Sequence, residues 1–275
     1  MFVSKIDAPM ILPTSIVEKV WGRDTLPAPF VAPAGLRVGE IWFEPPPQMP
    51  DLLVKYLFTS EKLSVQCHPD AAQAQAMGLG QTGKEECWVV VAAEAEATLG
   101  IGFNAPVSAE AMRAAALDGS IEDLLTWHSV QAGDVFYIPA GTVHAIGPGC
   151  AIIEVQQNED ITFRLYDYGR DRELHLDQGL QVASGTPYDM ALHSRLPASG
   201  HAALVDGPKF RLDYVDGVPD EALLYSYAGP VLVVPIAGEV LAAGEVTRPG
   251  ECAYAPDLAS VTFAPEGKAL VAASI

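Results

Sequence analysis

One stretch decides the fold of this chain: Gly133-Asp134-Val135-Phe136-Tyr137-Ile138-Pro139-Ala140-Gly141-Thr142-Val143-His144. Its residues 135–138 are β-branched, aromatic or aliphatic and are bounded by turn residues, which predicts a buried strand. The Pro-x-Gly corner after this strand would direct His144 back across it. Further along, residues 152–156 predict a second strand, and Arg164 lies between apolar neighbours in residues 162–166. These features predict a site inside a small β-barrel, with residues 133–170 as one of its walls.

The composition limits the class of protein. A chain of 275 residues is long enough for one large all-β domain or two smaller ones. Because 49% of the residues are hydrophobic and 19% are charged, the chain can bury a substantial core and is not disordered. The formal net charge of −19 argues against nucleic acid as a partner, since its phosphates attract basic surfaces. It does not argue against a phosphorylated small molecule, which needs only a few local cations.

The cysteines and the N-terminal segment bear on the cellular compartment. The four cysteines form no C-x-x-C pair and no dense disulfide framework. Residues 1–7 do not show a charged region followed by an apolar signal core, and no apolar run reaches the ~20 residues that a membrane helix requires. We therefore expect a soluble, cytoplasmic protein with neither a nucleic acid nor a membrane as partner. These features leave the oligomeric state open.

The chain reads as mainly β and as two units. We expect residues 1–184 to form an N-terminal domain, residues 185–207 a linker, and residues 208–275 a C-terminal domain. The segment of about 108–127 predicts a short helical insertion, because Ser108 can cap a helix and the following residues favour one. Short strands and glycine turns in the last unit repeat the pattern of the first in degenerate form. No histidine follows Pro256 there, so we expect no metal in the second barrel.

Three segments of the N-terminal half hold candidate metal ligands. Gln66 and His68 occupy alternate positions of a predicted strand, so both face one side and Cys67 faces the other. Glu86 lies on a second predicted strand, and His144 follows the corner described above. One amide oxygen, two imidazoles and a carboxylate suit zinc, or another divalent ion such as manganese or iron.

Each candidate also has a purely structural interpretation. His68 precedes a proline and could be a surface turn residue, and His144 could cap a turn. Glu86 shares a strand face with Lys84, and the two could form a solvated ion pair that contributes less than about 1 kcal/mol. Arg164 could pair with a nearby aspartate. The joint occurrence of these residues in strand contexts favours a site, but it does not name a reaction.

The same residues fall in blocks that resemble a known family. Residues 133–144 match G-x5-P-x-G-x2-H, the second signature of the cupin superfamily. Residues 63–70 resemble the L-S-[IV]-Q-x-H-P-D block of type I mannose-6-phosphate isomerases, and residues 84–88 resemble their K-x-E-x-W block. Residues 154–170 are similar to the E-[IV]-Q-Q-x-S-D-x-T-[YF]-R-[VL]-Y-D-[WY] block of the short bacterial branch. The resemblance covers most of residues 10–180 and is specific in combination.

This resemblance implies two cupin-like β-barrels, or jelly rolls, of which the second is degenerate. It implies an aldose–ketose isomerase that interconverts mannose 6-phosphate and fructose 6-phosphate, and one zinc held by Gln66, His68, Glu86 and His144. It also implies that Arg164 lies in the active site and that Ser64 helps to hold the phosphate of the substrate. We expect Trp21 and Arg170 to bind the substrate as well.

The sequence departs from the family in three ways that concern the substrate more than the metal. In one of them, Asn158-Glu159-Asp160 replaces the usual small residue before Asp160. The longer members carry a sizeable helical domain, to which only residues 108–127 could correspond. Their lysine in the phosphate region, just after the arginine block, has no clear counterpart here. Arg170 or Arg172 would take its place.

The implied reaction moves a proton between C1 and C2 of the sugar through a cis-enediol(ate). Negative charge develops on the two oxygens, where a bound zinc and Arg164 could stabilise it. Lys84 and Lys55 are the candidate bases, provided that burial lowers their pKa. The alternatives are a non-catalytic metal- or sugar-binding cupin, an isomerase of another phosphosugar, and a metal-dependent oxygenase. The oxygenase is the weakest of these, because Gln66 replaces the first histidine of the usual H-x-H pair.

Overall fold

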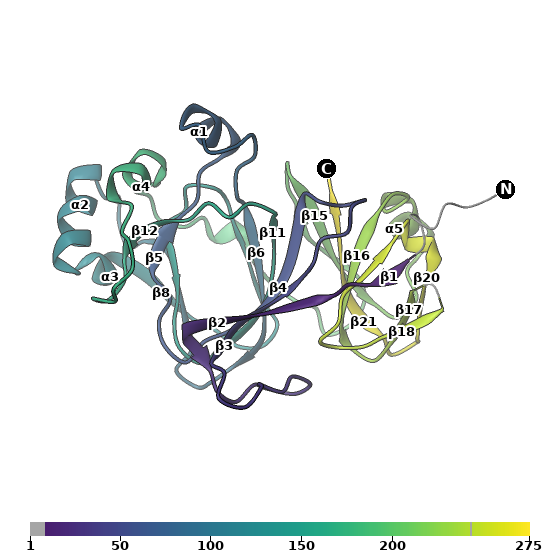
Figure 1. Ribbon diagram of the computed structural model, residues 1–275. Coiled ribbons are helices and arrows are strands. Elements are labelled where there is room, and N and C mark those ends of the chain that lie inside the picture. Colours follow the sequence, from purple (N-terminus) through teal and green to yellow (C-terminus); the bar gives the residue numbers. More distant parts are fainter. Residues whose placement is uncertain (1–8, 243) are drawn as a thin grey trace.

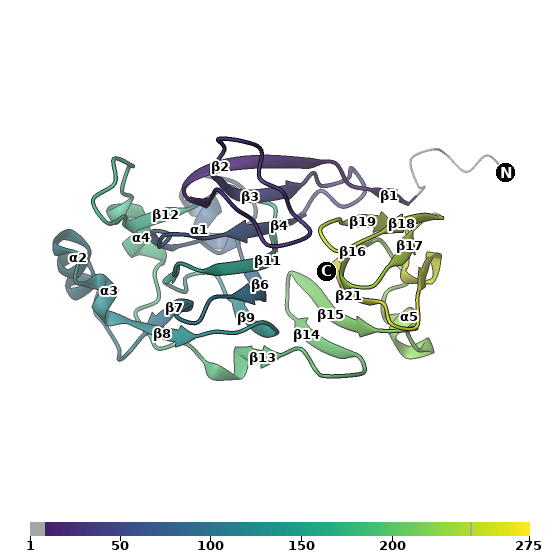
Figure 2. The same cartoon turned by 90° about the horizontal axis from the view of Figure 1, so that it is seen from below.

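The computed structural model describes residues 9–242 and 244–275, and residues 1–7, considered above for a secretion signal, lie outside them. The expected mainly β architecture is confirmed. Two β-rich units lie side by side, and helices cover the end of the first unit that is remote from the second (Figure 1; Figure 2). None of the helices formed by the described residues is long and apolar enough to span a membrane.

Two antiparallel sheets form the N-terminal barrel. The first joins, in spatial order, β13 (His193–Arg195), β9 (Asp134–Ile138), β6 (Glu86–Ala93), β11 (Cys150–Gln157), β4 (Leu52–Phe58), β3 (Val38–Phe43) and β2 (Thr14–Arg23). The second joins β12 (Phe163–Tyr166), β5 (Val65–Cys67), β10 (His144–Ile146), β7 (Thr98–Phe103) and β8 (Leu125–Ser129). The central strands β4 and β11 are buried along their whole length, which explains the long apolar runs in their sequences.

The described residues of the N-terminal unit form four helices: α1 (Ala71–Ala76), α2 (Ala109–Asp118), α3 (Ile121–Leu124) and α4 (Leu176–Val182). The Ser108 hydroxyl caps α2 by accepting from the Ala111 amide at 3.2 Å, and Gly119 ends the helix in the left-handed conformation. The expected helical segment 108–127 is therefore too long at its end. Residues 125–127 belong to β8 instead, because their backbone pairs with β7, a long-range contact that local propensity does not record.

Helix α4 is not predicted by the sequence. It contains Gly179, which lowers helix propensity by about 1 kcal/mol relative to alanine. The structure gives the reason for this glycine: a Cβ there would lie 2.5 Å from Leu165 Cδ2. The residue that weakens the helix locally thus allows the helix to pack closely on β12.

The C-terminal unit is a second β-structure. Its larger sheet joins β1 (Met10–Ile11), β19 (Ala253–Ala255), β16 (Val231–Ala237), β21 (Lys268–Ser274), β15 (Phe210–Asp216) and β14 (Ala202–Asp206). The smaller one joins β18 (Glu245–Thr247), β17 (Val240–Ala242) and β20 (Val261–Phe263), accompanied by α5 (Glu221–Ser226) and the 3-10 turn η2 (Leu258–Ser260). Strand β1 comes from the N-terminal part of the chain, so the segment before β2 connects the two units.

The segment 185–207, expected as a linker, is partly structured. It contains the 3-10 turn η1 (Met190–Leu192) and the whole of strands β13 and β14. Strand β13 pairs with β9 through His193, Ser194 and Arg195, a polar sequence whose strand structure depends on this partner rather than on its own pattern. The division of the chain into two domains at this segment stays a prediction.

A shared apolar core joins the two units. Leu52, Val54 and Tyr56 of β4 belong to the same buried cluster as Phe210 and Leu212 of β15. Two further clusters fill the inside of the N-terminal barrel and the space under its helices, and a fourth fills the C-terminal unit. Because the first cluster contains side chains from both units, neither unit can open on that side without exposing apolar surface of the other.

Candidate active site

A cavity of about 420 Å³ opens into the N-terminal barrel, which is within the usual size of a small-molecule site. Its charged lining residues are Lys19, Glu40, Lys55, Lys84, Glu86, Glu154, Asp160, Arg164, Arg172 and Glu173, with His144 and His175 beside them. Cations and carboxylates are thus mixed in the wall. Such a lining suits a polar, charged ligand better than an apolar one.

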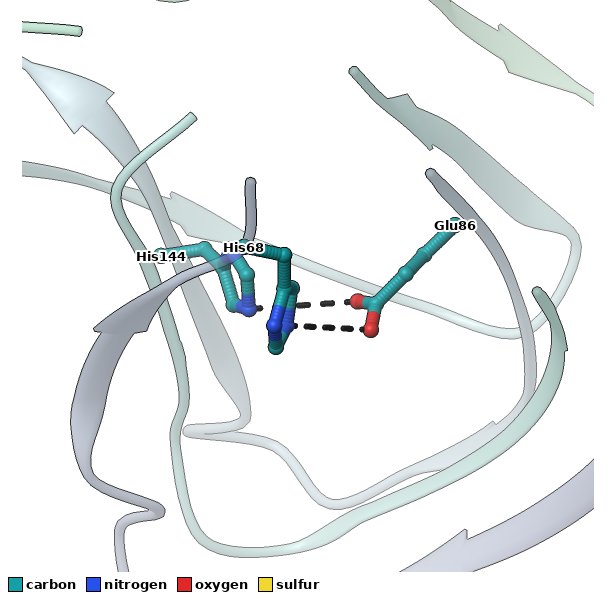
Figure 3. A group of neighbouring side chains, drawn as sticks. All are labelled: His68, Glu86 and His144. Atoms are coloured by element: carbon teal, nitrogen blue, oxygen red, sulfur yellow. Dashed lines mark ion pairs between the residues drawn. The ribbon is translucent and has the colours of Figure 1, made fainter. Parts of the chain in front are cut away.

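Three buried side chains converge beside this cavity from three separate segments, as Figure 3 shows. His68 follows β5, Glu86 begins β6 and His144 begins β10. His68 Nε2 lies 3.1 Å from Glu86 Oε1, and His144 Nε2 lies 3.8 Å from Glu86 Oε2. One ligand atom from each residue lies within 4.8 Å of the others, a spacing at which a single cation could contact all three.

Hydrogen bonds to the main chain orient both imidazoles. His68 Nδ1 lies 2.7 Å from the Ile161 carbonyl oxygen, and His144 Nδ1 lies 2.9 Å from that of Thr142. A carbonyl only accepts, so each Nδ1 carries the proton and each Nε2 presents a lone pair to the cluster. Burial lowers the pKa of His68, and it lowers that of His144 to about 4, so both rings are neutral at pH 7. This is the protonation state and orientation that a metal-binding histidine needs.

The acid and amide members of the set fit a cation too. Burial disfavours the Glu86 carboxylate, but its basic neighbours, among them the Lys84 ammonium 3.5 Å away, outweigh burial and hold its pKa well below the usual range. Gln66 Nε2 lies 3.3 Å from His144 Nε2, and Gln66 Oε1 accepts from Ser64 Oγ at 3.0 Å. Because the two ends of an amide have nearly the same shape, a half-turn would present the oxygen to a cation. The four expected ligands therefore lie together, and their donor atoms suit a divalent metal.

Cys67 lies outside this set, as strand alternation predicts. Its Sγ is directed to the Gly179 carbonyl oxygen, 3.6 Å away, and burial raises the pKa of its thiol to about 12. All four cysteines are free and buried.

A buried network of lysines and carboxylates forms one wall of the cavity. Lys55 Nζ lies 3.3 Å from Glu154 Oε1 and 5.6 Å from the centre of the Trp42 ring. Burial opposes the charged form of Lys55, but Glu154, Glu40 and Glu86 together outweigh burial and raise its pKa. Lys55 is therefore a cation at neutral pH, which differs from the lowered pKa that its expected role as a base requires.

Glu154 is the functional candidate that the sequence reasoning did not single out. Burial and the charge of Glu86 raise the pKa of its carboxyl group to about 8, against the opposing effect of Lys55. A signal was present in the sequence, because Glu154 is the one charged residue within the apolar strand of residues 152–156. A carboxyl group that titrates near neutral pH inside a cavity is a candidate for proton transfer.

The arginines occupy two different places. Arg164, on β12, lines the cavity, and its register partner on β5 is the expected ligand Gln66. Arg172 lines the cavity as well, whereas Arg170 does not. Of the other expected substrate-binding residues, Trp21 and Ser64 line the cavity. The structure thus brings together all the predicted site residues except Arg170.

Comparisons with known proteins give a consistent picture. No protein-family model matches the chain. The chain is 42% identical over 153 residues to a mannose-6-phosphate isomerase of Streptococcus mutans, covering 51% of this chain and 48% of that protein. It is 42% identical over 137 residues to a mannose-6-phosphate isomerase of Bacillus subtilis, covering 48% of this chain and 43% of the relative. The chain thus spans about half the length of the curated relatives that it matches.

Solved structures match over almost the whole chain. The crystal structure of the mannose 6-phosphate isomerase from Bacillus subtilis superposes with a TM-score of 0.78 at 24% identity, covering 97% of this chain and all of that one. A putative mannosephosphate isomerase from Archaeoglobus fulgidus gives a TM-score of 0.74 at 16% identity, covering 98% of each chain. The resemblance predicted from the sequence blocks is therefore confirmed: in sequence over about half its length, and in fold over nearly all of it, the chain is similar to mannose-6-phosphate isomerases.

Proposed function

We propose that this protein is a metal-dependent aldose–ketose isomerase that interconverts mannose 6-phosphate and fructose 6-phosphate. One observation carries the proposal: His68, Glu86 and His144 converge with oriented Nε2 atoms beside a cavity lined by cations and carboxylates. The similarity to curated mannose-6-phosphate isomerases supports the choice of reaction.

We propose zinc as the metal, held by Gln66, His68, Glu86 and His144. Nitrogen and oxygen donors in this number suit zinc, and a solved structure of the same fold is described as a zinc-bound holoenzyme. When bound, the metal would supply a Lewis acid that polarises the C1 and C2 oxygens of the sugar.

The chain's own residues would bind the sugar and move the proton. Glu154, with its pKa near neutrality, is the group best suited to take the proton from C2 and return it to C1, or the reverse. Lys55 keeps its charge and would hold Glu154 in place at 3.3 Å. Lys84, which lines the cavity 3.5 Å from Glu86, could donate a hydrogen bond to a substrate oxygen. Arg164 would stabilise the negative charge of the enediolate.

The test is isomerase activity on a panel of hexose phosphates, measured with and without a chelator. We expect turnover of mannose 6-phosphate that disappears with the metal and returns with added zinc. Full activity after metal removal would refute the metal-dependent reaction. Zinc binding without turnover of any panel member would favour the non-catalytic cupin, and turnover of another member alone would reassign the substrate.

We further propose that the protein acts in the cytoplasm. Its four cysteines are free and buried, which is compatible with a reducing compartment. The partner implied by the reaction is a small phosphosugar.

A further inference from the structure

One buried carboxylate holds two arginines at the edge of the cavity. Asp167 accepts from Arg172 Nε and Nη2 at 2.6 Å each, through its two oxygens, and from Arg170 Nη1 at 3.0 Å. Asp167 is only 2% exposed, and the two guanidinium groups supply hydrogen bonds to both of its carboxylate oxygens. The guanidinium groups of Arg170 and Arg172 thus bind the same carboxylate.

Arg170 does not line the cavity, and its side chain contacts other parts of the chain. Its Nη2 donates to the Lys62 carbonyl oxygen at 2.7 Å and lies 3.3 Å from Glu61 Oε2. Its guanidinium group also stacks over the Tyr168 ring, 5.4 Å from the ring centre. Both Nη atoms of Arg170 are thus occupied by groups of the chain itself.

Arg172 has the opposite geometry. After β12 the chain folds back against this strand. The His175 amide donates to the Arg164 carbonyl at 2.7 Å, and Arg164 Nη1 donates to the Glu173 carbonyl at 2.8 Å. This return places Arg172 beside Arg164 in the cavity wall. Asp167 occupies one edge of the Arg172 guanidinium, and Nη1 has no hydrogen bond to any of the described residues.

The surroundings of Arg172 favour an anion. The Arg164 Nε atom is buried and lacks a hydrogen-bond partner within the described part of the chain. Burial and the charge of Arg172 both lower the pKa of Arg164, as expected for two cations held close together. The nearby carboxylates of Asp160 and Glu173 are on exposed residues and can remain in solvent. Arg164 Nε and Arg172 Nη1 are therefore free donors on two adjacent guanidinium groups, and an anion could accept hydrogen bonds from both.

We propose that Arg172, rather than Arg170, receives the phosphate of the substrate, and that Asp167 is the residue that positions it. This inference rests on the proposed function for the identity of the substrate. The free edge of the Arg172 guanidinium can donate to a phosphate oxygen while the clamp by Asp167 fixes its orientation and removes most of its conformational freedom before the ligand binds.

Arg170 provides a matched control, because both arginines bind the same carboxylate. We expect Arg172→Met to raise KM for mannose 6-phosphate by about 10- to 100-fold, the loss typical of a charge-assisted hydrogen bond, and to lower kcat much less. Arg172→Lys should give an intermediate KM, since a lysine keeps the charge but not the planar fork. Arg170→Met should leave KM within about threefold. Zinc content and thermal denaturation show whether each variant is folded.

Asp167→Asn tests the positioning role through the split between KM and kcat. It should raise KM in the wild-type background but add little in the Arg172→Met background, because the two residues act as a unit. Equal effects in both backgrounds, or a KM increase for Arg170→Met as large as that for Arg172→Met, would overturn the proposal.

Calorimetric titration with inorganic phosphate separates this inference from the proposed function. If the wild type binds phosphate and Arg172→Met does not, while neither isomerises mannose 6-phosphate, the inference stands and the proposed reaction fails. If the wild type isomerises mannose 6-phosphate and Arg172→Met retains its KM, the reaction stands and the inference fails.

Discussion

At the scale of single residues, Glu154 shows how burial can adapt a carboxyl group to a task near neutral pH. Its side chain is buried on β11 with Lys55 as its ion-pair partner. Burial and Glu86 make the carboxylate unfavourable, while Lys55 makes it less so. The balance gives a group that releases its proton only at about pH 8, where an exposed glutamate would have done so near 4.5.

This balance predicts a pH-dependent stability of the metal-free protein. The pKa of Glu154 is higher in the folded chain than in the unfolded one, so the folded state binds this proton more tightly. Its contribution is fully present below about pH 4.5 and is lost as the pH rises toward about 8. We expect the free energy of unfolding of the chelated protein to fall across this window by on the order of a few kcal/mol from this group.

Urea titrations of chelated protein at several pH values check this prediction. Glu154→Gln, which cannot ionise, should flatten the decline between pH 5 and 8. Identical pH profiles for wild type and variant would show that the proton is not held by Glu154.

At the scale of elements, one contact joins the segment that carries His68 to the segment that carries Glu86, two of the expected metal ligands. The Lys84 amide, two residues before Glu86, donates to the Pro69 carbonyl, just after His68, at 3.0 Å. Gly83 makes this approach possible, because a Cβ there would lie 2.6 Å from the Asp70 carbonyl carbon. A side chain at residue 83 must therefore push the β5–α1 and β6 segments apart.

Gly83→Ala is accordingly expected to weaken zinc binding as well as stability. Overpacking of this kind typically costs about 1–3 kcal/mol, and the displacement separates His68 from Glu86. Thermal denaturation gives the stability, and competition with a chromophoric chelator gives the zinc affinity. Gly229→Ala is the control, since Gly229 has open space around its Cβ position. An unchanged zinc affinity in Gly83→Ala would show that the ligands do not depend on this contact.

At the scale of the whole molecule, the sequence predicts the elements that local residue patterns determine. It does not predict the elements that depend on pairing or packing with residues distant in sequence. The mainly β class follows from short apolar runs between turns, and alternation along the chain places the expected ligands Gln66, in β5, and His68, just after it, on one side. Strand β13 and the end of the helical segment at Leu124 depend on pairing with strands distant in sequence. Helix α4 depends on how closely Gly179 approaches Leu165.

The same distinction applies within the site. The sequence places Arg170 and Arg172 equally close to Arg164, because both follow it by a few residues. Only the return of the chain after β12, fixed by hydrogen bonds between Arg164 and residues 173–175, separates one arginine from the other. Likewise, the lysines can be recognised as neighbours of the ligands, but the pKa of Lys55 depends on three carboxylates that come from three different strands.

The four buried thiols have a consequence for how the molecule opens. Burial raises the pKa of each, to about 12 for Cys67 and Cys150, so an alkylating reagent can react with them only after local or global opening. Cys87 of the first unit and Cys252 of the second belong to the apolar cluster that both units share. The alkylation rate of each thiol therefore reports how often its own part of the molecule opens.

If the shared core makes the two units open together, a metal bound in the first unit also lowers the alkylation rate of the thiol in the second. Zinc at about a hundred times its Kd should slow the alkylation of Cys252 by roughly a hundredfold, as much as that of Cys87. Mass spectrometry of the labelled peptides measures both rates in one sample. Slowing confined to Cys67, Cys87 and Cys150 would mean that the C-terminal unit opens independently of the site.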